Sequence, residues 1–188
     1  MLRSLVPFFA TALAVSAPAL SSEIVPLPHF KSIDLRGGGK VTLVPGPSQR
    51  LTILEGSSKI TRLEVEPDGQ LVIDTCNTDC PRSYRLSVEI QSPQVPNLGV
   101  NGGGRISIMN GFGAQRALSA AVNGGGSIDS NSVEADNVSA AVNGGGELLV
   151  HAGTMLTGAV NGGGHVRYWG NPHLTVAVHG GGSVVRGD

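Results

Sequence analysis

The sequence Asn-Gly-Gly-Gly at residues 101–104 returns at residues 123–126, 143–146 and 161–164, and once more with histidine in first place at residues 179–182. The first positions of successive copies are 22, 20, 18 and 18 residues apart. Self-similarity at such an interval is typical of a stacked repeat, in which each unit buries its apolar face against its neighbours. The motif therefore predicts a repeat architecture rather than a globular domain around a single core.

Apolar residues alternate with other residues on both sides of each motif, as in Leu118-x-Ala120-x-Val122. A period of two predicts strands, so each repeat should consist of strand, glycine turn and strand. Stacking the repeats places one apolar column before the turns and a second column after them. The first column holds Val100, Val122, Val142, Val160 and Val178, and the second holds Ile106, Ile128, Leu148, Val166 and Val184.

These columns predict an all-β fold, a right-handed parallel β-helix (β-solenoid) with about 18–22 residues per coil. A left-handed hexapeptide helix also has 18-residue coils, but it needs an aliphatic residue at every sixth place. Val160 and Val166 fit that rule and Pro172 does not. The varying coil length also favours the right-handed form.

The N-terminal half should be less regular. Residues 33–43 form a first copy with Arg36 in place of asparagine, and Leu35 and Val41 match Val100 and Ile106. A divergent copy spans residues 63–73, where Glu-Pro-Asp-Gly stands at the turn. Because Pro-Asp-Gly also makes turns, this alignment favours turn formation rather than ligand binding as the role of the glycines.

The glycine triplets are predicted to be structural turns, because a sharp corner between strands often needs a positive φ. If Gly125 is a site that needs one, replacing it with valine should cost more than about 1 kcal/mol. Stacked asparagines could also form an amide ladder. A phosphate-binding loop leads into a helix, whereas these glycines lead into strands. The predicted turn residues are Gly37, Gly38, Gly39, Gly102, Gly103, Gly104, Gly124, Gly125, Gly126, Gly144, Gly145, Gly146, Gly162, Gly163, Gly164, Gly180, Gly181 and Gly182.

Residues 1–19 resemble a secretory signal peptide, with Arg3, an apolar stretch and a small-x-small site ending at Ala19. We expect residues 20–188 to form one exported β-solenoid domain without an integral membrane segment. The chain has 13 basic and 14 acidic residues, a net charge of −1, which predicts no nucleic-acid partner. Cys76 and Cys80 should then pair as a local disulfide, although a metal site or a redox pair remained as alternatives.

The pattern as a whole resembles the putative auto-transporter adhesin head domain (GIN domain) family of bacterial exported proteins. The resemblance rests on residues 33–43, on Val65 to Ile73, on the glycine turns of residues 101–184 and on Tyr-x-Gly-x-Pro at residues 168–172. The family usually has Gly-Ser-Gly at its turns, where this chain has Gly-Gly-Gly. The resemblance implies a right-handed parallel β-helix in the periplasm or at the cell surface of a Gram-negative bacterium, and it brings no catalytic residues.

Catalysis by a β-helix needs clustered carboxylates or a metal. Glu134 and Asp136 are neighbours, but the repeat places them in a loop between coils. Four histidines, at positions 151, 165, 173 and 179, do not share one column and suit a solvated surface. Trp169 could contact a sugar ring, whereas Tyr168 should pack inside.

The chain is therefore expected to be a non-enzymatic exported protein of the cell envelope, an adhesin-like binding or structural module. It needs no cofactor, and its partner would be an envelope glycan or a protein. The alternative is a small carbohydrate-active β-helix enzyme that acts on a polysaccharide, a possibility that rests on fold analogy.

Overall fold

The computed structural model describes residues 22–77 and 79–188. The regular secondary structure of these residues consists of β-strands. The predicted signal peptide, residues 1–19, lies outside the described residues. In the part that is described, no helix has the length and apolar character needed to span a membrane. The N-terminal strands are β1 (Glu23–Val25), β2 (Ser32–Gly37), β3 (Lys40–Pro45), β4 (Arg50–Glu55), β5 (Arg62–Val65), β6 (Gln70–Asp74) and β7 (Ser87–Ser92). They are followed by β8 (Asn97–Gly102), β9 (Arg105–Ile108), β10 (Gln115–Gly124), β11 (Ser127–Gly144), β12 (Glu147–Asn161), β13 (His165–Trp169), β14 (His173–His179) and β15 (Ser183–Arg186).

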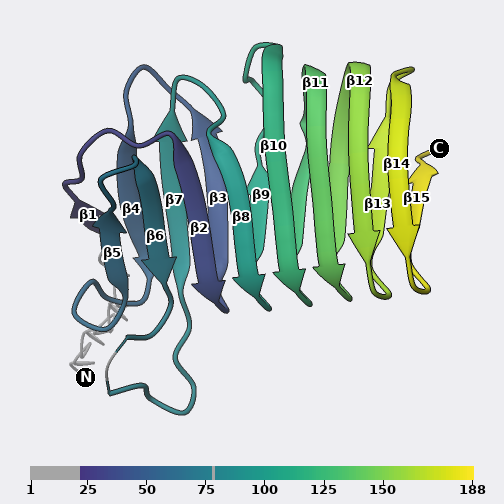
Figure 1. The fold of residues 1–188 in the computed structure, drawn as a ribbon. Helices are drawn as coiled ribbons and strands as arrows, with labels where there is room; N and C mark the ends of the chain where they lie inside the picture. Colours follow the sequence, from purple (N-terminus) through teal and green to yellow (C-terminus); the bar gives the residue numbers. More distant parts are fainter. Residues whose placement is uncertain (1–21, 78) are drawn as a thin grey trace, which may run out of the picture.

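Two series of parallel strands run through the molecule as two layers (Figure 1). One series pairs β6, β2, β8 and β10 with the second halves of β11 and β12 and ends at β14. The other pairs β7, β3 and β9 with the first halves of β11 and β12 and ends at β13 and β15. Each glycine motif carries the chain from the first series to the second, as it does between β8 and β9.

The register confirms both predicted columns. Val122 pairs with Val100 and Val142, and the series continues to Val160 and Val178. In the other series Ile106, Ile128, Leu148, Val166 and Val184 are successive partners. Residues one coil apart therefore occupy equivalent places, as the spacing of the motifs predicts.

Antiparallel pairs at the N-terminal end make the sheet mixed. β4 pairs antiparallel with β1 and β7, and β5 pairs antiparallel with β6. The predicted all-β fold is therefore confirmed. The prediction of a wholly parallel sheet is wrong for this end of the chain.

The alignment of the divergent copy was also wrong. The Glu-Pro-Asp-Gly turn closes the β5–β6 hairpin, and β6, which follows the turn, stacks on β2. Leu71 and Ile73 thus occupy the places that the sequence assigned to Leu63 and Val65. Both strands alternate, so the alternation alone did not show which of them joins the stack.

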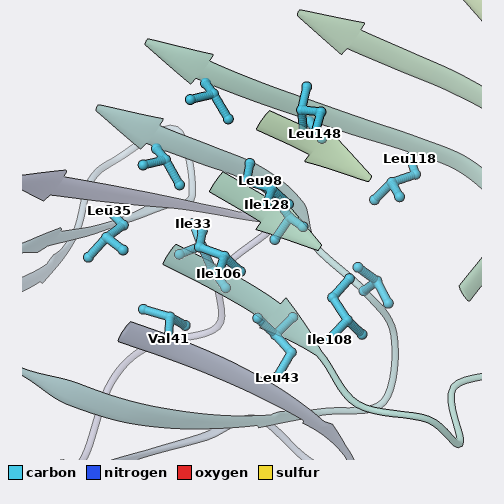
Figure 2. Packing of buried hydrophobic residues seen from close by; sticks show 14 of the residues in the cluster. Ile33, Leu35, Val41, Leu43, Leu98, Ile106, Ile108, Leu118, Ile128 and Leu148 are labelled. Atoms are coloured by element: carbon cyan, nitrogen blue, oxygen red, sulfur yellow. The ribbon is translucent and has the colours of Figure 1, made fainter. Parts of the chain in front are cut away.

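The core lies between the two layers (Figure 2). Ile33 and Leu35 from β2 lie near Val41 and Leu43 from β3, and Ile106 continues the same packing in the next coil. All five side chains are buried. Alternating residues on each strand therefore form one continuous apolar interior, which is what two-sided stacking of coils requires.

The three glycines of a motif have different surroundings. Gly124, the first, has φ +117°, and a Cβ on it would lie 2.8 Å from the carbonyl oxygen of Gly102. Gly126, the third, has no positive φ, but its Cβ would lie 2.5 Å from the carbonyl oxygen of Gly104. Gly125 has neither a positive φ nor any atom within 4 Å of the Cβ position. The condition for the predicted cost of Gly125→Val is therefore not met, and the positive φ belongs to the residue before it.

Cys76 and Cys80 form a disulfide, with Cα atoms 5.8 Å apart. It lies in the connection between β6 and β7, outside the stacked strands. The predicted local staple is present in the structure.

Candidate binding surface

The outward residues of β8, β10, β11, β12 and β14 form three regular rows, together called the ladder face. The amide row consists of Asn101, Asn123, Asn143, Asn161 and His179. The alanine row consists of Ala121, Ala141, Ala159 and Ala177, and Gly99 of β8 precedes it. The hydroxyl row consists of Ser119, Ser139, Thr157 and Thr175. The rows are regular because the stacked coils repeat the same alternation of inward and outward side chains.

Hydrogen bonds connect the asparagines of the amide row into a ladder. Asn123 donates from Nδ2 to Oδ1 of Asn101, Asn143 donates to Asn123, and Asn161 donates to Asn143, each at 2.9 Å. The predicted amide ladder is thus confirmed. A carboxamide has two N–H donors and two acceptor lone pairs, so each inner asparagine keeps one of each for a ligand after serving its two neighbours.

The ladder ends on a carboxylate. Asn101 donates from Nδ2 to Oδ1 of Asp34 on β2, and Arg36 donates to the other oxygen, Oδ2, at 2.7 Å. Asp34 is buried, and its hydrogen bond to Arg36 raises the pKa of that guanidinium. The ion pair neutralises the charge at this end, because a buried carboxylate without a cation would be strongly unfavourable.

A hollow of about 240 Å³ lies at the same end of the ladder face. Gly99 forms part of its lining, and a Cβ on that glycine would lie 3.3 Å from Oδ1 of Asp34. The absence of a side chain at Gly99 therefore leaves the carboxylate reachable from the hollow. Asn101 and Asn123 also line this hollow, so carboxylate and amide groups meet there.

The opposite face has different chemistry. Its first outward row runs through Arg105, Ser127, Glu147, His165 and Ser183. Arginine, glutamate, histidine and two serines occupy this row, so neighbouring coils present different groups there. The ladder face presents the same groups at successive coils, so it is the surface suited to a ligand that is itself repetitive.

The predicted carboxylate pair is not in a loop. Glu134 and Asp136 lie inside β11, both exposed, where the register with β12 shifts between Ser130 and Glu134 and again between Ala135 and Asn137. The loop prediction was therefore wrong, because β11 continues through the turn that the repeat implied.

The histidines are distributed over three strands. His151 is register partner of Glu134 and Trp169, while His173 and His179 occupy the two ends of β14. His165 shares a hydrogen bond of 3.0 Å between its Nδ1 and Oγ of Ser183. Among the described residues there is no cluster of three or more side chains able to hold a metal ion.

Trp169, the predicted sugar contact, is half-buried against the C-terminal residues. Its Nε1 donates to the carbonyl oxygen of Asp188 at 3.1 Å, and Gly187 lies directly on the indole. The ring is therefore engaged by the chain's own backbone. Tyr168 packs against the core in register with Val150, as predicted.

Part of the chain matches a known protein family. A family model described as "Putative auto-transporter adhesin, head GIN domain" matches residues 106–172, which confirms the resemblance drawn from the sequence. No curated protein matches the chain.

Several solved structures are similar to this chain over most of its length. A putative adhesin from Bacteroides fragilis NCTC 9343 aligns with a TM-score of 0.56 at 17% identity, over 90% of this chain and 98% of that chain. A putative adhesin and a putative lipid binding protein, both from Parabacteroides distasonis ATCC 8503, align with TM-scores of 0.42 and 0.37. Each is 15% identical and is matched over 89% of this chain and 96% of its own. The first alignment shows a shared fold.

Proposed function

Starting from the match of residues 106–172 to the head GIN domain family, we propose that this chain is a non-enzymatic, adhesin-like protein of the cell envelope. Its ladder face binds a neutral, hydroxyl-rich polymer, an envelope or extracellular glycan. The observation that supports this function is the amide ladder, with hydrogen-bonding groups repeated from coil to coil.

The geometry of the ladder face suits a polymer. Neighbouring strands lie about 4.8 Å apart, so unused amide groups recur at that interval along the stack. Single hydrogen bonds contribute only about 1 kcal/mol net, so affinity has to come from many contacts made along one chain. The alanine row between the amide and hydroxyl rows has short side chains, so a ligand lying over it can contact the amide and hydroxyl rows at once.

The charge of the ladder face favours a neutral ligand. Its alanine, hydroxyl and asparagine members carry no charge, and the ladder's carboxylate at Asp34 is paired with Arg36. An anionic polymer would find no row of cations there to replace its counterions. Selectivity for neutral over uronate-containing glycans follows from this composition.

We also propose that residues 97–186 form a right-handed parallel β-helix. The parallel register of equivalent residues supports it, as do coil lengths that vary between 22 and 18 residues. Export past a signal peptide of residues 1–19, followed by residence in the periplasm or at the surface of a Gram-negative cell, is proposed from the sequence and from the adhesin family.

The experiment compares residues 20–188 with two arginine variants on a panel of neutral and uronate-containing polysaccharides, and scores both retention and released fragments. Ala141→Arg places a long side chain in the alanine row. Ala114→Arg, at an exposed position before β10, is the matched control. Retention of a neutral glycan that Ala141→Arg abolishes and Ala114→Arg preserves supports the proposal.

Three other outcomes contradict it. Released fragments would identify an enzyme and redirect attention to Glu134 and Asp136. Equal retention by both variants would move the binding site away from the ladder face. Absence of both retention and fragments would rule out a glycan ligand and leave a protein partner.

A further inference from the structure

The two ends of the strand stack are different. At the N-terminal end the outer strands are β1 and β5, which have three and four residues. β5 carries an ion pair between Arg62 and Glu64. Short edge strands and charged edge residues are devices that prevent sheets from pairing with each other.

At the C-terminal end one of the two outer strands, β14, lacks these devices, while the other, β15, has four residues and ends in Arg186. Within the described residues no strand pairs with the outer edges of β14 and β15. β14 has seven residues, His-Leu-Thr-Val-Ala-Val-His, without an acidic residue, lysine, arginine or proline. A strand of this length and composition is a template for the addition of another strand.

The apolar interior is also open at this end. Leu174, Val176 and Val178 are 39%, 47% and 41% exposed, whereas Leu156 and Val160, which occupy the same columns one coil earlier, are both at 0%. Val184 on β15 faces the same space, because a Cβ on Gly158 would lie 3.2 Å from Val176 and 3.6 Å from Val184. The last coil therefore exposes apolar side chains of the kind that the next coil buries elsewhere in the stack.

We propose that a second copy of this chain covers the open end, so that the protein forms a two-fold symmetric dimer through β14 and β15. The axis runs perpendicular to both layers, between the two copies of Val176 in one layer and the two copies of Val184 in the other. Each outer strand then pairs antiparallel with its own copy, and the two apolar interiors become continuous.

The sequence of β14 is complementary to itself in this arrangement. Antiparallel pairing centred on Val176 places Leu174 opposite Val178 of the other copy, and Thr175 opposite Ala177. Apolar side chains meet apolar ones on the inner face, and the ends bring His173 opposite His179. β14 contains no acidic residue, lysine or arginine. Pairing two copies of this strand therefore brings no such charges of the same sign together.

The choice of a second copy follows from the difference between the ends. Head-to-tail stacking would require the last coil of one molecule to add to the first coil of the next, and short, charged strands occupy that end. A contact between identical ends closes after two copies and leaves no open edge.

The size of the end face fits a reversible dimer. A strand of seven residues is about 23 Å long and the layers are about 10 Å apart, so each end face has a cross-section of about 230 Å² and two copies bury roughly 500 Å² between them. That area is below the range of stable interfaces, so the dimer should be weak and dissociate on dilution.

The test is sedimentation velocity of residues 20–188 over a wide range of concentration. The expected result is a reversible monomer–dimer equilibrium without larger species. Val176→Lys places two like charges on the axis and should shift the mass to that of one chain. Met109→Lys makes the same change at a position of similar exposure, 50% against 47%, and should leave the dimer intact.

Cross-linking provides a second readout that does not depend on a disruptive variant. Val176→Cys should form an intermolecular disulfide on mild oxidation, because the residue faces its own copy across the axis, whereas Met109→Cys should not. A chain that stays monomeric at all concentrations, open polymers, or a dimer that survives Val176→Lys would each overturn the proposal.

Discussion

Alanine substitution at each glycine of one motif tests the stacking geometry position by position. At Gly124 an alanine has to adopt φ near +117° with its Cβ 2.8 Å from the carbonyl oxygen of Gly102. Backbone strain of this kind costs about 1–3 kcal/mol, and the close contact adds to it. At Gly126 the φ is not positive, but the Cβ would lie 2.5 Å from both the carbonyl oxygen of Gly104 and a methyl of Val100. Overpacking there should cost about 1–3 kcal/mol.

Gly125 provides the internal control. Nothing lies within 4 Å of a Cβ at this position, and its φ is not positive. Alanine should therefore be neutral or stabilise by about 0.4–1 kcal/mol, because it restricts the unfolded chain. Urea unfolding at constant slope measures the three differences. Loss of stability at Gly125 comparable to that at Gly124 and Gly126 would refute the geometric assignment of the three roles.

Three further predictions concern the ladder, the core and acid stability. Asn143→Asp removes the donor to Asn123 and sets two acceptor oxygens against each other, so urea unfolding should show a loss of about 1 kcal/mol. Leu156→Ala should cost about 2–5 kcal/mol in the same assay because the side chain is fully buried. Leu174→Ala, one coil further and partly exposed, should cost less in dilute solution. Hydrogen bonds from Ser58 lower the pKa of Glu23 below its ordinary value of 4.5. The stability that they contribute is present above that value and is lost as pH falls through the lower pKa, so Glu23→Gln should flatten the acid side of the stability profile.

The regular half of the fold could be predicted from the sequence because its pairing is between equivalent residues. Spacing and alternation were enough to place Val122 and Ile128 in their columns, since each side chain meets its counterpart one coil away. The amide ladder followed from the same reasoning.

Other features depend on contacts that no repeat encodes. Asp34 ends the ladder through a hydrogen bond to Asn101, which lies 67 residues away in the sequence. The β5–β6 hairpin alternates as a coil strand does, and its antiparallel pairing is decided by tertiary packing. Trp169 appeared exposed by its alternation, yet the backbone of Gly187 covers it. The distinct roles of the three glycines likewise required the close approach of neighbouring coils.

The most direct test of the proposed function is an NMR titration of the side-chain amides with a retained neutral glycan. If the ladder face is the binding surface, the NH₂ resonances of Asn123, Asn143 and Asn161 shift together and saturate at one ligand concentration. The amide of Asn110, in the turn after β9, stays unchanged as the control. Shifts confined to residues outside the three rows, with the ladder asparagines unchanged, would contradict the assignment of this face.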